Sequence, residues 1–311
     1  SLYSLSQELS MNLHLPLLLL LSACTVEGGK ESSPPQTEDS TPDPQSDEDG
    51  DGLVAEFEAL VGTSTTSVDT DADGCSDAVE ILGYFDPLNP ADRPYTGAYP
   101  RGPRPDQETL DAIIATSGEA FAKGSLNPNW TLTDQHGQEI ELRDFFGQLV
   151  VVDLASEWCE PCQEATPYWE SFYQEHKEEG VVVIQILLEG QVNNSEPVAT
   201  RWAENYGVSF PVLVDHSPGD YTVTEVAQYY LDVEGLAYDI PNASAIDRQQ
   251  IIRDLYHIQL SPTDAVVESL LAEPVPTVQV ALPDNAEELR AQLGFTPGSW
   301  ITPPGLCTTG G

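Results

Sequence analysis

The run from Leu149 to Leu154, apolar except for Asp153, leads after three residues into the motif Trp158-Cys159-Glu160-Pro161-Cys162. An apolar run of this length is typical of a strand that is buried on both faces of a sheet. A helix that starts at Cys159 would place Cys162 one turn further along. A central strand that runs into a dithiol at the start of a helix indicates an α/β domain.

The residues around this junction carry the alternating elements of such a domain, beginning at about Asn127. We expect strands at residues 130–133, 139–142, 149–154, 181–188, 210–214, 243–246 and 251–258. We expect helices from residue 159, at 196–206, near 223–231 and from about 263. The order is βαβ followed by ββα. In the first helix, aromatic residues recur at helical spacing and are predicted to pack into the core; they are Tyr168, Trp169, Phe172 and Tyr173.

The cysteine pair can in principle hold a metal or exchange disulfides. A structural zinc site needs four ligands, and neither a second C-x-x-C pair nor a histidine pair lies nearby in the sequence. At a strand-to-helix junction, unpaired amide groups and the helix dipole stabilise an anionic sulfur and lower its pKa. Cys159 is therefore predicted to attack a substrate disulfide, and Cys162 to resolve the mixed disulfide. Glu160 places a negative charge near the sulfur, which opposes thiolate formation, and Pro161 shapes the turn.

Residues 124–271 resemble the TlpA/ResA-like membrane-tethered thioredoxins and the wider redoxin family. The resemblance rests on residues 129–134, 150–162, 202–207 and 210–215. It implies a thioredoxin-like fold, in which a central mixed β-sheet is flanked by helices, and a redox-active disulfide that needs no other cofactor. Motifs of the Cys-Glu-Pro-Cys type occur in reductases of the cytochrome c maturation branch, and this analogy favours a reductase.

The resemblance also assigns roles outside the cysteine pair. Asp153 matches the buried acid that assists proton transfer from the resolving cysteine; an outward-facing residue at the strand end is the alternative. Pro241, which follows Ile240, matches the cis-proline that faces the disulfide and positions a substrate backbone, with an ordinary trans turn as the alternative. Trp158, Glu160 and Pro161 complete the predicted site because they belong to the motif.

The first 24 residues are predicted to be an export signal. From Met11 the chain is rich in leucine up to Leu21 and then reads Ser22-Ala23-Cys24, although no lysine or arginine lies between Met11 and the apolar run. The run is shorter than the about 20 residues that span a bilayer and fits the apolar region of a signal peptide. Its end resembles the lipobox of bacterial lipoproteins, which implies lipidation of Cys24; a buried apolar helix is the alternative. Residues 25–46 are polar and rich in proline, which predicts a disordered linker.

Two acidic segments, 22 residues apart, share the spacing D-x-D-x-D-G-x5-E. The candidate ligands are Asp47, Asp49, Asp51 and Glu58 in the first, and Asp69, Asp71, Asp73, Asp77 and Glu80 in the second. In such a loop the first three carboxylates converge on one hard cation, the glycine permits a sharp turn, and the last acid closes the ligand shell. The repeats predict Ca²⁺ binding, and a charged linker is the alternative. They also resemble bacterial thrombospondin type 3 repeats, which implies calcium-stiffened spacers.

The charge balance excludes nucleic acid as a partner. The chain has 11 Lys and Arg against 52 Asp and Glu, a formal charge of -41, which repels phosphate backbones.

Cys75 and Cys307 belong to no motif. In an oxidising compartment they can form a disulfide, but the sequence does not show whether their sulfur atoms meet.

These predictions divide the chain into a signal peptide with lipobox (1–24), a linker (25–46), acidic repeats (47–92), a connector (93–123), a redox domain (124–272) and a C-terminal extension (273–311). We expect a thiol-disulfide oxidoreductase on a lipid anchor, in the periplasm or on the surface of a bacterium. It would reduce disulfides of extracytoplasmic proteins and be recharged by a membrane electron donor. One alternative is a peroxiredoxin-like peroxidase, although the signature P-x-x-x-T-x-x-C is absent upstream of Cys159. The other is a calcium-dependent surface binding protein that carries a thioredoxin-like fold.

Overall fold

The computed structural model describes residues 43–188, 197–215, 226–227, 230, 240–257, 265–276, 278, 280–295, 300 and 307. All of them fall in the compact unit of residues 42–311. The predicted export signal, its Cys24 and residues 25–42 of the predicted linker lie outside the described residues. Within the described part of the chain, no helix has the length and apolar character needed to cross a membrane.

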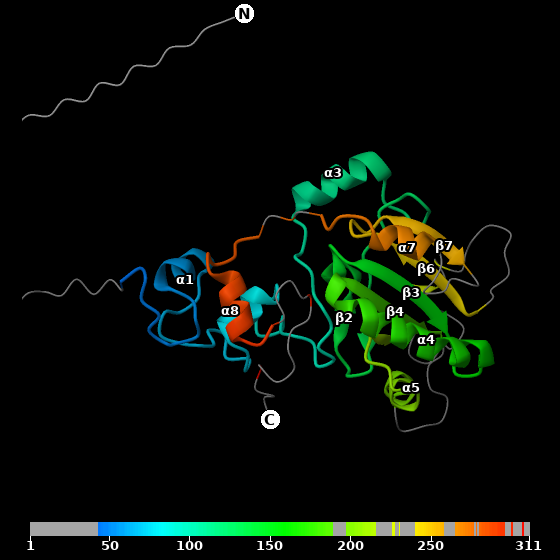
Figure 1. Cartoon of the computed structure of the whole chain (residues 1–311), viewed down its shortest axis with the longest axis horizontal. Helices are drawn as coiled ribbons and strands as arrows, with labels where there is room; N and C mark the ends of the chain where they lie inside the picture. The colour runs from blue at the N-terminus through cyan, green and yellow to red at the C-terminus, as the bar shows by residue number, and fades with distance from the viewer. Residues whose placement is uncertain are drawn as a thin grey trace, which may run out of the picture. The chain divides into compact units, whose positions relative to one another are not determined.

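A seven-stranded mixed sheet forms the centre of the redox domain (Figure 1). Its strands are β1 Thr131–Asp134, β2 Glu139–Glu141, β3 Leu149–Ala155, β4 Val181–Leu187, β5 Val212–Val214, β6 Asn242–Ile246 and β7 Ile252–His257. They lie in the order β2-β1-β5-β4-β3-β6-β7, with β3, β4 and β5 parallel and the other pairs antiparallel. Every residue of β3 and of β4 is buried. This confirms the thioredoxin-like fold, and the observed strand ends lie within two residues of the predicted ones.

Three helices of the domain match predicted ones: α4 Glu160–His176, α5 Val198–Tyr206 and α7 Ala265–Leu271. In α4 the side chains of Trp169, Phe172 and Tyr173 are buried. The prediction was wrong for Tyr168, which is 69% exposed, because neighbours on a helix point about 100° apart. The helix expected near residues 223–231 lies mostly outside the described residues.

The connector contains a helix that the sequence analysis did not predict, α3 Gln107–Ser117. The Asp106 carboxylate caps its start by accepting a hydrogen bond from the Thr109 N–H at 2.8 Å, and Gly118 follows its end. None of its residues is buried. A surface helix is usually recognised in a sequence by a clear apolar stripe, and α3 has only a weak one. Its capping residues were nevertheless readable signals.

A second, smaller core lies among α1 Ala55–Val61, α2 Asp77–Leu82 and α8 Ala286–Gln292. Its buried apolar residues are Leu53, Phe57, Ala78, Ile81, Leu82, Leu289 and Phe295. Residues 43–92 and 280–295, which we call the repeat module, therefore fold together although most of the chain separates them. The Cys75–Cys307 disulfide adds a covalent link between the second acidic segment and the C-terminal extension.

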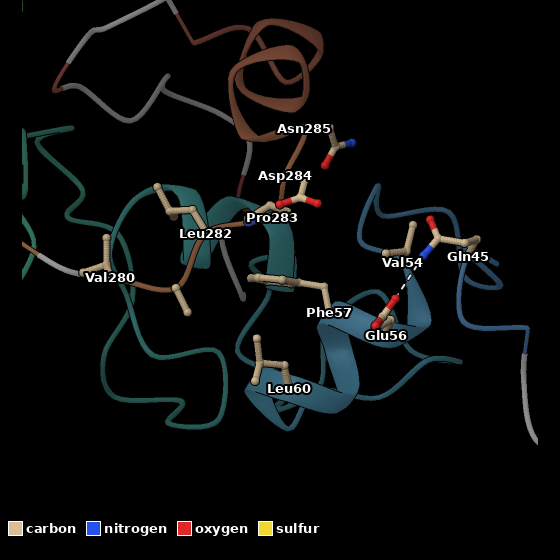
Figure 2. A pocket seen from close by; sticks show the side chains of 11 residues that line it. Gln45, Val54, Glu56, Phe57, Leu60, Val280, Leu282, Pro283, Asp284 and Asn285 are labelled. Atoms are coloured by element: carbon tan, nitrogen blue, oxygen red, sulfur yellow. Dashed lines mark hydrogen bonds between the residues drawn. The ribbon is translucent and has the colours of Figure 1, made fainter. Parts of the chain in front are cut away.

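The repeat module also has a groove of about 580 Å³ between α1 and residues 280–285 (Figure 2). Phe57 and Leu60 line one side, and Val280 and Leu282 line the other. Its rim carries polar groups, among them Glu56, which accepts a hydrogen bond from Gln45 Nε2 at 3.1 Å. Residues just upstream of the first acidic segment are thus part of the module's structure.

Candidate redox site and acidic loops

The sulfur atoms of Cys159 and Cys162 form a disulfide at the point where the chain passes from β3 into α4. Cys159 is the N-cap of α4, and its Sγ accepts a hydrogen bond from the N–H of Cys162 at 3.2 Å. Both cysteines are buried, and Cys162 is completely so. A sulfur that accepts a backbone N–H at a helix N-terminus is stabilised as a thiolate once the disulfide is reduced. This geometry supports Cys159 as the nucleophile and Cys162 as the resolving residue.

The other motif residues lie on the surface beside this disulfide. Trp158 is 66% exposed, and Glu160 and Pro161, in the first turn of α4, are exposed as well. The neighbouring Glu157 is held by Arg201 of α5, whose Nη2 lies 2.5 Å from Glu157 Oε1. The turn that carries the cysteines is thus bonded to a second helix, and the indole ring of Trp158 lies on the surface.

The peptide bond between Ile240 and Pro241 is cis, so the trans alternative is wrong. The carbonyl oxygen of Ile240 lies 3.7 Å from Sγ of Cys159. The segment that leads into β6 therefore borders Sγ of Cys159, which is where the resemblance places a proline that positions a substrate backbone. That role of Pro241 stays a prediction.

Asp153 is buried in β3 with 1% of its surface exposed, so the outward-facing alternative is wrong. Its Oδ2 accepts a hydrogen bond from Gln185 Nε2 at 2.7 Å. Burial raises the pKa of Asp153 to about 7, while hydrogen bonds from the side chains of Gln185 and Trp169 act in the opposite direction. A carboxyl group with a pKa near 7 can both take up and release a proton at neutral pH.

Gln185 connects Asp153 to the helix that carries the cysteines, and the sequence analysis missed it. Its Nε2 also donates to Thr166 Oγ1 at 3.0 Å, and the Thr166 hydroxyl donates to the carbonyl oxygen of Cys162 at 2.9 Å. Its Oε1 accepts from Trp202 Nε1 at 2.6 Å. One signal was available in the sequence, because Gln185 is the single polar residue in the apolar run from Val181 to Leu187.

The two acidic segments form loops with the same backbone geometry. In the first, the carboxylate of Asp47 accepts hydrogen bonds from the N–H groups of Gly50 and Gly52 at 2.8 and 3.2 Å. In the second, Asp69 accepts from Ala72 and Gly74 at 2.7 and 2.9 Å. The first aspartate of each repeat therefore closes its loop in the same way, which supports the repeat recognised in the sequence.

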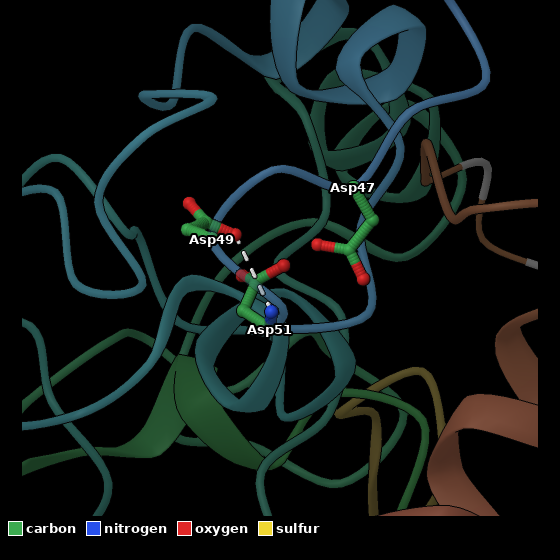
Figure 3. Close-up of side chains that lie close together, drawn as sticks. All are labelled: Asp47, Asp49 and Asp51. Atoms are coloured by element: carbon green, nitrogen blue, oxygen red, sulfur yellow. Dashed lines mark hydrogen bonds between the residues drawn. The ribbon is translucent and has the colours of Figure 1, made fainter.

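Each loop collects carboxylate oxygens that have no hydrogen-bond donor. Asp47, Asp49 and Asp51 each offer one oxygen within 4.8 Å of the others (Figure 3). The equivalent residues of the second loop do the same. The buried oxygens without a hydrogen-bond partner are Oδ2 of Asp49, Asp51, Asp71 and Asp73, and both oxygens of Glu58 and Glu80. Buried carboxylates require a compensating positive charge or donors. These residues suit a hard divalent cation such as Ca²⁺.

In both loops, the last glutamate of the repeat has a raised pKa. Burial, followed by repulsion from the nearby aspartates, raises the pKa of Glu58 to about 7 and that of Glu80 to about 9. Asp77 differs from Glu58 and Glu80, because its two oxygens accept hydrogen bonds from the backbone N–H and the hydroxyl of Thr70 at 2.8 and 2.7 Å. A positive charge does approach the second loop, since Arg93 Nε lies 3.8 Å from Asp73 Oδ2.

Comparisons with known proteins concentrate on the redox domain. Residues 124–255 match the model of the AhpC/TSA family. Thiol-disulfide oxidoreductase ResA of Bacillus subtilis (strain 168) is 35% identical over 107 residues, which are 34% of this chain and 58% of that protein. The chain thus spans about three fifths of that relative's length. ResA of one strain of Bacillus cereus is 30% identical over 121 residues, which are 38% of this chain and 68% of that protein.

The chain belongs to the ResA-like redoxins of the AhpC/TSA family. Solved structures with similar folds include the thioredoxin domain of a thiol-disulfide oxidoreductase from Bacteroides vulgatus. It is 21% identical, with a TM-score of 0.37, and covers 48% of this chain and 94% of that one. A thiol:disulfide interchange protein from Chlorobium tepidum is 19% identical, with a TM-score of 0.39, and covers 47% of this chain and 96% of that one.

In this redoxin, the matched region contains the cysteine motif, Asp153 and Pro241, and ends before α7. The acidic loops and α8 lie outside the matched region. The structure brings Cys159, Cys162 and the Ile240–Pro241 peptide together. It gathers the loop carboxylates elsewhere in the chain.

Proposed function

We propose that this redoxin is a thiol-disulfide oxidoreductase that reduces disulfides of extracytoplasmic proteins. The observation that carries the proposal is the Cys159–Cys162 disulfide at the N-terminus of α4, bordered by the Ile240–Pro241 segment. This arrangement gives a nucleophilic sulfur, a resolving sulfur one turn further along the helix and a backbone edge for an extended substrate. Family membership and the names of the curated relatives support the same activity.

The reaction uses both sulfurs in turn. In the reduced enzyme the Cys159 thiolate attacks one sulfur of a substrate disulfide, forms a mixed disulfide and displaces the other substrate sulfur as a thiolate. Cys162 then loses its proton to Asp153 and attacks Sγ of Cys159. The second substrate sulfur leaves, and the Cys159–Cys162 disulfide forms. The substrate gains two electrons and two protons in all, and an external thiol donor must reduce the enzyme again.

Insulin reduction and the reduction potential of the cysteine pair test this function. Turnover that disappears in Cys159→Ser but persists in Cys307→Ser, with a potential of about -270 mV, would support a disulfide reductase. A potential of about -120 mV would indicate a disulfide donor instead. Consumption of hydrogen peroxide without insulin reduction would favour the peroxidase, and a pair that does neither would favour a binding protein.

The proposed location is outside the cytoplasm, on a lipid anchor at Cys24, with a membrane protein as the electron donor. The sequence of residues 11–24 supports it. A labelled fatty acid should attach to the wild-type chain expressed in a bacterium and not to Cys24→Ala, which should move to the soluble fraction. The proposal is wrong if the wild type carries no label.

Calcium binding is a second proposed function, carried by a separate observation: both carboxylate oxygens of Glu58 and of Glu80 are buried without a hydrogen-bond partner. Two Ca²⁺ ions, one in each loop, would supply the missing positive charge. The loops suit Ca²⁺ better than Mg²⁺, because they offer several carboxylate oxygens and Mg²⁺ usually keeps its waters. Isothermal titration of the full chain should therefore show two Ca²⁺ ions bound in the presence of excess Mg²⁺. No heat at millimolar calcium would leave the repeats as an acidic spacer.

A further inference from the structure

Gln185 lies directly opposite Asp153 in the parallel pairing of β3 with β4. Both side chains therefore project from the same face of the sheet. Gln185 is completely buried, and an amide in that position destabilises the fold unless its hydrogen bonds are made. The amide bonds to Asp153, to Thr166 of α4 and to Trp202 of α5.

Trp202 determines which way round the amide lies. The indole N–H can only donate, and it lies 2.6 Å from the oxygen of Gln185. The NH₂ group must then face Asp153 and Thr166, which it contacts at 2.7 and 3.0 Å. Since an amide N–H only donates, Oδ2 of Asp153 is held as an acceptor toward Gln185.

The same amide connects the carboxyl group to the resolving cysteine. Thr166 accepts from Gln185 and donates to the carbonyl oxygen of Cys162. Asp153, on β3, and the first turn of α4 are thereby held at a fixed spacing through two hydrogen-bonded side chains. Removing Gln185 would break this link and would also take away a donor to the charged form of Asp153.

Two uncharged side chains hydrogen-bond to Asp153, and an alanine lies opposite it in the sheet. Gln185 faces it from β4, Trp169 from α4, and Ala243 is its register partner on β6. Among the buried residues of α4, the titratable ones are Cys162, which is in the disulfide here, and Tyr173. Among the described residues, charge–charge interaction is not a cause of the shift at Asp153. Hydrogen-bond donors are thus the main means by which this site can favour the carboxylate.

We propose that Gln185 is a positioning residue that holds Asp153 toward Cys162 and sets the pH at which Asp153 accepts the Cys162 proton. The inference rests on the proposed function, because the proton moves in the step that resolves the mixed disulfide. In that step the Cys162 S–H proton passes to the Asp153 carboxylate, and the Cys162 thiolate forms a bond to Cys159 Sγ. The bond from Cys159 to the substrate sulfur breaks, and that sulfur leaves with its electron pair.

The test compares Gln185→Met and Gln185→Glu with the wild type and with Asp153→Asn, all as full chains. The first variant removes the donor, and the second keeps the shape and the acceptor for Trp202 while adding a negative charge. Gln174→Met is the matched control, because Gln174 lies on the exposed side of α4 and bonds to Glu170 and Ser209. Two quantities are measured between pH 5 and 9: the rate of mixed-disulfide resolution and the infrared carboxyl signal that is absent in Asp153→Asn.

Both Gln185 variants should move the midpoint of the rate profile and of the carboxyl titration upward by about one pH unit or more, because a donor to the charged form is lost. Gln174→Met should leave both midpoints unchanged. Gln185 variants that titrate at the wild-type midpoint, while Asp153→Asn flattens the profile, would overturn the role of Gln185 and leave the redox function intact. If the wild type does not reduce disulfides, the proposed function fails, and the carboxyl titration still decides whether Gln185 controls Asp153.

Discussion

Leu289 of α8 covers Gly52 of the first acidic loop so closely that a β-carbon at Gly52 would lie 2.3 Å from Leu289 Cδ1. Gly52 also has a φ of +102°, which side-chain-bearing residues rarely adopt. Gly52 is thus needed twice: its backbone conformation forms the turn of the loop, and its lack of a side chain leaves room for Leu289 of α8.

Leu289→Ala should therefore destabilise the repeat module. Leu289 is 3% exposed, and emptying such a position typically lowers the free energy of unfolding by about 2–5 kcal/mol. Urea denaturation followed by circular dichroism measures the loss. Leu60→Ala is the matched control, because Leu60 is 70% exposed and should change stability by less than about 0.5 kcal/mol. Equal losses in the two variants would contradict the packing of α8.

Removing the Cys75–Cys307 disulfide should lower the melting temperature, because the bond joins cysteines 232 residues apart and restricts the unfolded chain. Loss of a native disulfide commonly costs about 2–5 kcal/mol. Cys75→Ser, Cys307→Ser and the double variant should melt alike, since each removes the same bond. A double variant clearly less stable than both single ones, or free thiols at these positions in the denatured wild type, would speak against the bond.

Glu58→Gln and Glu80→Gln should each reduce the calcium stoichiometry from two ions to one, as measured by isothermal titration. In calcium-free buffer both variants should be at least as stable as the wild type, because each replaces an acid whose charged form is disfavoured by burial and by the nearby aspartates. Glu56→Gln, an exposed glutamate on the same helix as Glu58, should keep both ions. Two ions bound by Glu80→Gln would show that Glu80 is not a ligand.

Asp153→Asn should stabilise the oxidised protein at alkaline pH. Burial raises the pKa of Asp153 from 3.8 to about 7, so the folded state holds the proton more tightly than the unfolded state does. The stability that the protonated group provides is complete below about pH 4 and is lost as the pH rises through about 7. Each pKa unit corresponds to about 1.4 kcal/mol. Denaturation at about pH 4 and about pH 8.5 measures this: the variant should have the higher free energy of unfolding only at about pH 8.5. The same difference in the free energy of unfolding at both pH values would contradict a buried, titrating Asp153.

The redox domain was predictable because its sequence signals are local. The apolar runs of β3 and β4 show buried strands directly, and the cysteine motif marks the start of α4. The acidic loops were equally readable, because their ligands recur at a fixed spacing. Tyr168 was not, since an aromatic residue next to Trp169 fits the same pattern whichever of the two points outward.

What the sequence could not show are contacts between residues distant along the chain. Gln185 becomes part of the redox site only through the pairing of β3 with β4 and through Trp202 of α5. The place of α8 beside α1 and α2, and the partner of Cys75, likewise depend on tertiary structure. The free oxygens of Glu58 and Glu80 were visible only once the burial of both residues was known.

The core shared by α1, α2 and α8 makes the redox domain an insertion, since the chain leaves the repeat module after residue 92 and returns to it by residue 280. The module is discontinuous in sequence and continuous in space. A shortened chain that ends before α8 would lose two of its seven core residues, Leu289 and Phe295, as well as Cys307. Residues that follow the redox domain in the sequence therefore help to form the module that precedes it. An experiment that replaces the redox domain with another domain must keep both parts of the repeat module, residues 43–92 and 280–295.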